Sequence, residues 1–211
     1  MIVPEHSARV VKLGGSLLTL PDLSYRLREW IAVQTPKANI IIVGGGVLVD
    51  EVQRFCRLQK MGQEAEHWLC VRAMGINTQS LSWLLEDVSC VVDFEHLKRS
   101  LVGGGSCLFD AEQFLERHEP GCRGVCLPVD EIVTSDSIAA RVAVVLSADE
   151  LVLLKSTGLS TATTIEEAAQ RGYVDGFLPQ LASELPVTRC VNFRDESCSE
   201  TRLYKTNELL F

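Results

Sequence analysis

The segment 10–18, which reads Val-Val-Lys-Leu-Gly-Gly-Ser-Leu-Leu, contains residue types that can bind phosphate. An apolar run ends near Lys12, and Gly14, Gly15 and Ser16 follow. Backbone N–H groups are accessible where side chains are absent, and the ammonium of Lys12 and the hydroxyl of Ser16 lie beside them, so this segment can hold phosphate oxygens. The alternative is a tight turn without a ligand, and the segment alone leaves both interpretations open.

A second glycine turn repeats this arrangement. The apolar residues 40–43 run into Gly44, Gly45 and Gly46, and a helical pattern follows at once. The N-terminus of a helix carries partial positive charge and free N–H groups, which favour an anion. Two such turns at the ends of adjacent parallel strands would lie side by side, an arrangement suited to a phosphoryl group in transfer. Neither turn has the Walker or the dinucleotide-binding glycine spacing.

Two later segments carry further polar groups. Asp136 opens a helical pattern rich in small residues, where an acid ordinarily acts as a cap that stabilises the helix by about 1 kcal/mol. After the apolar run 151–154 comes a polar loop with a glycine, formed by Lys155, Ser156, Thr157 and Gly158.

The elements that must position these residues alternate between strand and helix. Runs rich in β-branched residues at 8–13 and 39–43 are typical of strands buried on both faces, and the spacing of Leu23, Leu27, Trp30 and Ile31 predicts a helix over 22–34. Further helices are expected at 47–58, 64–87 (with a possible break at Gly75), 110–117, 136–147 and 164–171. Further strands are expected at 90–92, 108–109, 125–127, 150–154 and in the tail from Val187. The pattern predicts an α/β fold, a three-layer α/β/α sandwich around a mainly parallel sheet, in one domain over 1–211.

Composition excludes several classes of partner. The chain has 211 residues, 20 basic and 28 acidic, and a formal charge of −8 without a concentrated basic stretch. This argues against nucleic acid or an anionic membrane as the main partner. The N-terminus lacks the pattern of a signal peptide and no run of eighteen apolar residues occurs, so we expect a cytoplasmic protein.

The eight cysteines are spread along the chain, which suits a reducing compartment. His118, Cys122 and Cys126 could ligate zinc in principle, but they lack the paired C-x2-C spacing, and ordinary thiols are the expected interpretation. We therefore predict no protein metal site.

Taken in order, the four polar segments resemble those of the amino acid kinase family, and the resemblance covers nearly the whole chain. It rests on Lys12-x-Gly14-Gly15-Ser16, Gly44-Gly45-Gly46, Ser135-Asp136-Ser137-Ile138-Ala139-Ala140 and Lys155-Ser156-Thr157-Gly158-Leu159. The family includes acetylglutamate, aspartate, uridylate and isopentenyl phosphate kinases. The resemblance implies a homo-oligomeric phosphotransferase that uses ATP and Mg²⁺.

Residue roles also follow from the resemblance. Lys12 would contact the γ-phosphoryl oxygens, and Asp136 would hold Lys12 in place. Nucleotide phosphates would meet Gly14, Gly15 and Ser16, and the nucleotide would extend along Lys155, Ser156, Thr157 and Gly158. The acceptor would be held by Gly44, Gly45 and Gly46. Phosphoryl transfer requires mainly such positioning and charge stabilisation.

Within the family, His67-Trp68, Arg72-Ala73-Met74, Leu127-Pro128 and the segment 133–140 are similar to the short kinases of one-carbon cofactor pathways, such as the aminomethylfuranmethanol phosphate kinase of methanofuran synthesis. Val129-Asp130-Glu131-Ile132 differs from the His-Ser-Trp-Asp expected there, so the acceptor could differ. Arg72, one helical turn after Trp68, could bind a phosphorylated or carboxylate acceptor, although a packed Trp68 and a solvated Arg72 are the favoured alternative.

One departure keeps a second function open. Several family members carry a cationic residue in a Gly-Gly-Met-x-x-Lys segment, and Gln180 stands at the corresponding position here. Lys155 or Mg²⁺ could supply the missing charge. The alternative is a non-catalytic sensor or carrier that binds a nucleotide or an anion.

Overall fold

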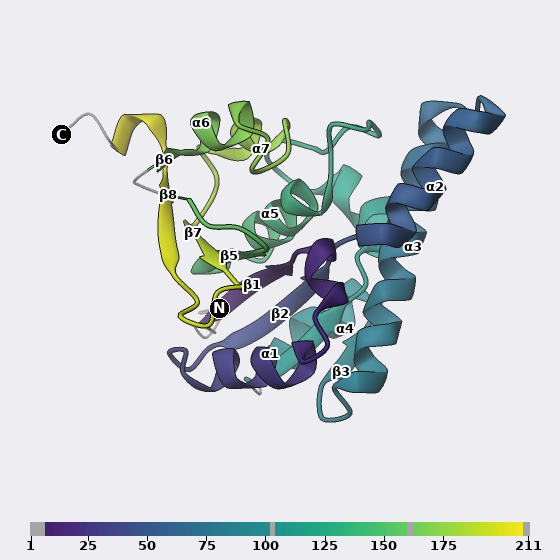
Figure 1. Cartoon of the computed structure of the whole chain (residues 1–211). Helices are drawn as coiled ribbons and strands as arrows, with labels where there is room; N and C mark the ends of the chain where they lie inside the picture. Colours follow the sequence, from purple (N-terminus) through teal and green to yellow (C-terminus); the bar gives the residue numbers. More distant parts are fainter. Residues whose placement is uncertain (1–6, 102–103, 160–162, 209–211) are drawn as a thin grey trace.

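The computed structural model describes residues 7–101, 104–159 and 163–208 (Figure 1). Its centre is an eight-stranded sheet with the order β3-β4-β2-β1-β5-β7-β8-β6. β7 and β8 are antiparallel, and the other strand pairs described are parallel. The strands are β1 (Ala8–Leu13), β2 (Ala38–Val43), β3 (Ser89–Val91), β4 (Ser106–Phe109), β5 (Glu150–Lys155), β6 (Thr163–Thr164), β7 (Val187–Asn192) and β8 (Glu200–Tyr204).

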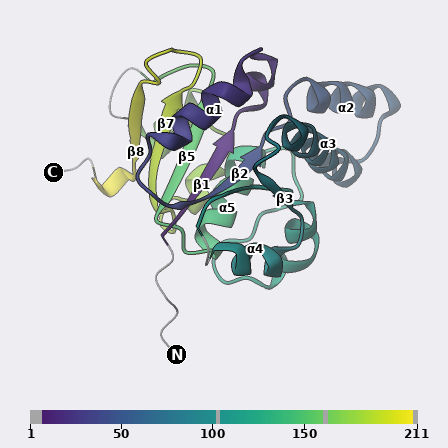
Figure 2. The ribbon, with the colours of Figure 1, turned by 90° about the horizontal axis from the view of Figure 1, so that it is seen from below.

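Helices cover both faces of this sheet (Figures 1 and 2). α1 (Leu23–Ala32) lies on one face, whereas α4 (Phe94–Ser100), α5 (Ser135–Val145), α6 (Ile165–Gln170) and α7 (Leu178–Leu181) lie on the other. The antiparallel pair α2 (Gly46–Gln59) and α3 (Gln63–Leu84) extends beyond the β4 side of the sheet. Shorter turns of helix are η1 (Gly15–Thr19), η3 (Phe114–His118), η4 (Glu119–Gly121) and η5 (Thr206–Glu208).

Side-chain alternation along the strands explains the two covered faces. Val10 of β1 packs in the core beneath α5, whereas Val11 and Leu13 pack with Leu27 and Trp30 of α1. All six residues of β1 are buried. A parallel strand with helices on both sides must be mostly apolar on both faces. This explains why four of the six residues in 8–13 are apolar, the other two being Arg9 and Lys12. The predicted three-layer α/β sandwich is confirmed.

Two details of the predicted elements are wrong. α3 continues through Gly75 without a break. The glycine serves packing, because a Cβ on Gly75 would lie only 2.7 Å from the Asp110 Oδ2. The segment 125–127 is not a strand, since its N–H groups have side-chain acceptors. Val125 donates to Glu184 and Leu127 donates to Glu119, both at 3.0 Å.

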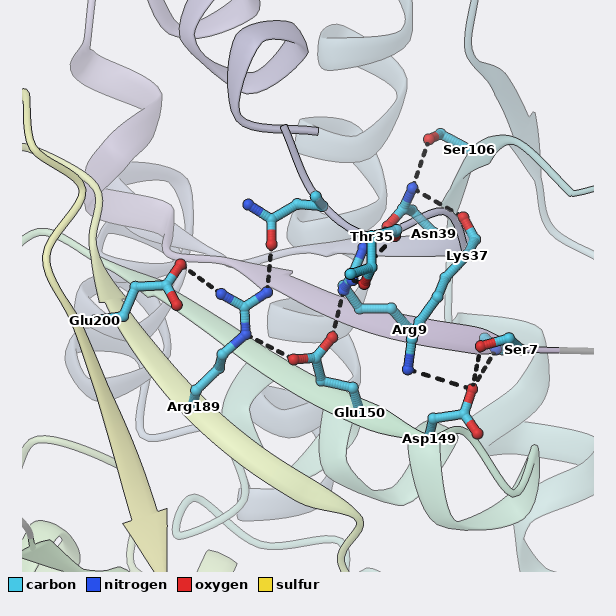
Figure 3. A network of polar contacts seen from close by, with 12 residues as sticks. Ser7, Arg9, Thr35, Lys37, Asn39, Ser106, Asp149, Glu150, Arg189 and Glu200 are labelled. Carbon is cyan, nitrogen blue, oxygen red and sulfur yellow. Dashed lines mark hydrogen bonds and ion pairs between the residues drawn. The ribbon is translucent and has the colours of Figure 1, made fainter. Parts of the chain in front are cut away.

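The N-terminal ends of the central strands are joined by a polar network (Figure 3). The buried Arg9 of β1 donates through Nε to Glu150 of β5 at 2.5 Å and through Nη1 to Asn39 of β2 at 3.0 Å. Arg189 of β7 reaches the other Glu150 oxygen at 2.6 Å. One carboxylate thus joins three neighbouring strands, at the edge of the sheet opposite to the glycine turns.

Candidate active site

Lys12 and Asp136 meet at the C-terminal edge of the sheet. Lys12 lies one residue before the end of β1, and its Nζ is 2.8 Å from the Asp136 Oδ1. Asp136 lies in the first turn of α5, whose N-cap is Thr134. Both residues are nearly inaccessible, with 6% and 4% of their surfaces exposed. The sequence placed them 124 positions apart, and the packing of α5 on β1 brings them together.

A second lysine shares the same carboxylate. The Nζ of Lys155, at the end of β5, lies 2.5 Å from the Asp136 Oδ2. Burial would raise the pKa of Asp136, but the two lysines outweigh it and hold the pKa at about 2. The pKa of Lys12 is lowered, first by burial and also by Lys155, although Asp136 opposes the shift. Two ammonium groups share one negative charge, so this cluster carries net positive charge into the space above it.

The two predicted glycine turns lie side by side. β1 and β2 are parallel neighbours, with Leu13 opposite Val43, so both turns leave the sheet at the same edge. A Cβ on Gly15 would lie 2.1 Å from the amide nitrogen of Gly46. Gly46 has a φ of +52°, a conformation that glycine adopts without strain. Two backbone segments can approach this closely only where neither carries a Cβ atom.

The buried side chain of Asn77 holds the second turn in place, and no local sequence pattern marks this role. Its Nδ2 donates to the carbonyl oxygens of Gly44 at 2.9 Å and Gly45 at 2.7 Å. Gly44 lies beneath the surface, where a Cβ would approach the Gly15 nitrogen to 2.7 Å. Its carbonyl is therefore satisfied within the protein, and the two glycines after it face the open space.

Two hollows, each of about 570 Å³, meet at Lys12, Gly15 and Ser16. The first, which we call the α2/α3 cavity, is also lined by Gly45, Gly46 and residues of α2 and α3. The second, which we call the β5 hollow, is also lined by Gly14, Tyr173 and the loop Lys155, Ser156, Thr157 and Gly158. The shared residues are those with the phosphate-binding pattern, so a group passing from one hollow to the other would pass Lys12.

Tyr173 shapes the β5 hollow. Its hydroxyl donates to the Thr157 carbonyl at 2.9 Å, and the Nζ of Lys155 lies 5.4 Å from the centre of its ring. Burial raises the pKa of the phenol, so it stays protonated and remains a donor. Tyr173 thereby contacts the last residue of β5 and the loop that follows it.

Asp175 fixes the start of α5. Its carboxylate accepts hydrogen bonds from the N–H and hydroxyl groups of Thr134 and Ser137, and from the N–H groups of Phe177 and Leu178. These bonds orient the helical turn that carries Asp136. Asp175 lies in the stretch 175–180 that departs from the family pattern, and its acceptor role depends on groups that are distant in the sequence.

Two residues singled out from the sequence lie away from the hollows. Arg72 pairs with Glu112 at 2.9 Å and lines a separate surface depression with Trp68. The α3 face that carries both residues is turned away from the α2/α3 cavity, which instead receives His67 and Arg194. The structure therefore does not bring Arg72 to the glycine turns. Gln180 is exposed and lines neither hollow.

Within residues 7–101, 104–159 and 163–208, no group of three or more His, Cys, Asp or Glu side chains is placed to hold a metal ion. The same residues contain no helix long and apolar enough to span a membrane. The eight cysteines are all free thiols.

Residues 7–167 match the sequence profile of the amino acid kinase family. No curated protein sequence matches the chain significantly.

Solved structures share the fold at low sequence identity. UMP kinase from Ureaplasma parvum is similar with a TM-score of 0.68 and 13% identity, over 94% of this chain and 99% of that one. Uridylate kinase from Archaeoglobus fulgidus has a TM-score of 0.60 and 15% identity, over 95% and 93%. Aspartate kinase from Clostridium acetobutylicum has a TM-score of 0.62 and 10% identity, over 94% of this chain and 63% of that one.

Proposed function

Because the chain belongs to the amino acid kinase family and is thereby a phosphotransferase, we propose that it transfers the γ-phosphoryl group of ATP to a small acceptor with a phosphate or carboxylate group. The observation that carries this proposal is the meeting of two hollows at Lys12, Gly15 and Ser16. A bimolecular transfer needs two substrates held in line, with positive charge where the group moves.

The β5 hollow is the proposed nucleotide side. Lys155, Ser156, Thr157 and Gly158 line it, and Gly14 contributes to the shared edge. A nucleotide bound there would direct its phosphates toward Lys12 and Lys155. Lys12 and Lys155 would hold the nucleotide phosphates on this side, and Mg²⁺ bound to the nucleotide would supply further positive charge.

The α2/α3 cavity is the proposed acceptor side. Gly45 and Gly46 line it beside Lys12, whereas Gly44 supports the turn from below. Lys12 would stabilise the charge that develops on the transferred group, and Asp136 would keep its ammonium in place. Stabilisation by such preorganised groups is usually the largest contribution to catalysis.

Lys155 takes the place of the missing family lysine in this proposal. Gln180 is exposed and outside both hollows, whereas the ammonium of Lys155 lies on Asp136 and faces the nucleotide side. Two cations therefore still flank the transfer point. The Gln180 departure also favours a second candidate, a sensor or carrier that binds nucleotide without turnover.

The finer assignments are also proposals. The resemblance at 67–68, 72–74, 127–128 and 133–140 supports an acceptor from one-carbon cofactor synthesis of the methanofuran type. One domain spans the chain, with the acceptor on its N-terminal part and the nucleotide on its C-terminal part. Members of the family usually form oligomers, which supports a homo-oligomer here. Eight free thiols support a reducing compartment such as the cytoplasm.

The test has two stages. Thermal unfolding with and without ATP and Mg²⁺ measures nucleotide binding, and ADP release with a panel of phosphorylated and carboxylate acceptors then measures transfer. Binding followed by acceptor-dependent ADP release is expected. Binding without release for any acceptor would favour the sensor or carrier, and no binding at all would contradict both functions.

A further inference from the structure

Arg194 reaches the α2/α3 cavity from a distant part of the chain. It lies in the connection between β7 and β8, and its Nη2 donates to the Ser16 carbonyl and to the Thr19 hydroxyl, each at 3.1 Å. The side chain is thereby fixed against η1, which also carries the predicted phosphate-binding serine. Arg194 lines the α2/α3 cavity and not the β5 hollow.

Its charge is available to a ligand. Among the described residues, Arg194 has no carboxylate within ion-pair distance, whereas Lys12, the other lysine or arginine on the cavity wall, is paired with Asp136. The two bonds of Arg194 use Nη2, and no described residue accepts from Nε or Nη1. A guanidinium with free N–H groups, held by two other bonds, is a preoriented donor for an oxyanion.

Acidic residues on the cavity wall limit where an anion can lie. Asp50, Glu66, Asp130 and Glu131 line the cavity from α2, α3 and the loop before α5, and none of them makes an ion pair with a described residue. Like charge repels an anion from these carboxylates. The lysine and arginine on the cavity wall that can attract a phosphate are Lys12 and Arg194.

We propose that Arg194 binds the phosphate group of the acceptor and so selects phosphorylated acceptors, the role that the sequence had suggested for Arg72. This inference rests on the proposed function and adds to it the acceptor class and the residue that recognises it. Because Nη2 is bonded to Ser16 and Thr19, the free Nη1 of Arg194 donates to one phosphate oxygen. Another oxygen of the acceptor phosphate forms the new bond to the γ-phosphorus beside Lys12, as the bond from that phosphorus to ADP breaks.

The test measures binding in the two hollows separately. The full chain is first titrated with AMP-PNP and Mg²⁺, which reports on the nucleotide side alone. With AMP-PNP saturating, methyl phosphate is then titrated, and acetate serves as the carboxylate probe. We expect methyl phosphate to bind, acetate to bind at least tenfold more weakly, and Arg194→Gln to weaken methyl phosphate at least tenfold with AMP-PNP binding unchanged. Arg194→Lys, which keeps the charge but loses the guanidinium and its two anchoring bonds, should lie between.

Arg26→Gln is the matched control. Arg26 donates to the Asp195 carbonyl and lies over the Phe193 ring, so this variant loosens the same connection without removing a cavity cation. It should bind methyl phosphate within twofold of the unchanged chain. Equal weakening by Arg26→Gln and Arg194→Gln would reduce Arg194 to a structural role and overturn the proposal, as would unaltered binding in Arg194→Gln or a loss confined to Arg72→Gln.

The remaining outcomes separate the two proposals. A chain that binds AMP-PNP but not methyl phosphate overturns the role of Arg194 and leaves the nucleotide side intact. A chain that binds methyl phosphate but not AMP-PNP contradicts the kinase function, and the Arg194 variants still decide the anion site. Circular dichroism shows whether Arg194→Gln folds. If it does not fold, the affinities of Arg194→Lys and Arg26→Lys for methyl phosphate are compared instead.

Discussion

Gly15 and Gly46 are in direct backbone contact: a Cβ on Gly15 would lie 2.1 Å from the Gly46 nitrogen and 2.6 Å from its Cα. These residues come from turns after two neighbouring parallel strands, and together with Lys12 they line the α2/α3 cavity. The close approach explains why both turns are rich in glycine. It also makes the site sensitive to a single methyl group.

Gly15→Ala should therefore separate the turns. The added carbon meets backbone atoms that cannot rotate away, so we expect the turns to move apart and the free energy of unfolding to fall by about 1–3 kcal/mol. A displacement of the reacting groups by about 1 Å costs on the order of a hundredfold in turnover, so kcat should also fall. Urea unfolding and acceptor-dependent ADP release measure the two effects. Gly62→Ala, whose Cβ would meet nothing within 4 Å, is the control, and equal behaviour of the two variants would refute the role of the contact.

Lys12→Met should remove turnover and leave most of the stability. Loss of a preorganised charge at the transfer point is expected to lower kcat at least a hundredfold. Asp136 keeps Lys155 at 2.5 Å, so the free energy of unfolding should fall by less than the roughly 3–5 kcal/mol typical of a buried charge left unpaired. Lys37→Met, at the opposite edge of the sheet, should keep its kcat. An active Lys12→Met protein would remove Lys12 from the mechanism.

Acid should weaken the fold through Asp136. Its pKa is about 2 in the folded protein against 3.8 for an ordinary aspartate, so its contribution to stability is complete above pH 3.8 and is lost as the pH falls toward 2. The contribution is about 2 kcal/mol at neutral pH. Urea unfolding between pH 5 and pH 2.5 measures the loss. Lys155→Gln removes one of the two charges that lower this pKa, so its stability should depend less on pH over this range. An identical slope in both proteins would exclude Asp136 as the source.

Arg9→Met should destabilise the protein without touching catalysis. Arg9 is 1% exposed and holds Glu150 and Asn39 across three strands. Its loss leaves the Asn39 Oδ1 without its donor, whereas Glu150 keeps Arg189 at 2.6 Å, so the free energy of unfolding should fall by about 1–3 kcal/mol. The kcat should stay unchanged, because three residues of strand, about 10 Å, separate Arg9 from Lys12.

Arg28→Met is the comparison for that experiment. Arg28 pairs with Asp87 on the surface, where both side chains are largely exposed, and its removal should leave the unfolding midpoint nearly unchanged. A fall in kcat in Arg9→Met at temperatures where it is fully folded would indicate coupling between the two edges of the sheet.

The sequence was sufficient for the alternation of strands and helices. Each buried strand must be apolar on both faces, so 8–13 and 39–43 stand out as runs, and a helical stripe such as Leu23, Leu27 and Trp30 follows from one buried face. Local chemistry also marked both glycine turns, because glycines after an apolar run, and Lys12 before the first turn, are visible without any knowledge of packing. The segment 125–127 was misread because its N–H groups bind carboxylates that lie 8 and 59 positions away along the chain.

Only the tertiary structure decided which side chains share a space. Asn77, Asp175 and Arg194 have no local signal, since each acts on atoms far away in the sequence: the Gly44 and Gly45 carbonyls, the start of α5, and the Ser16 carbonyl. The same holds for the pairing of Lys155 with Asp136 and for the separation of Arg72 from the cavity. Spacing along a helix or strand determines on which face of the element a residue lies. Which other element packs against that face depends on how the layers are arranged.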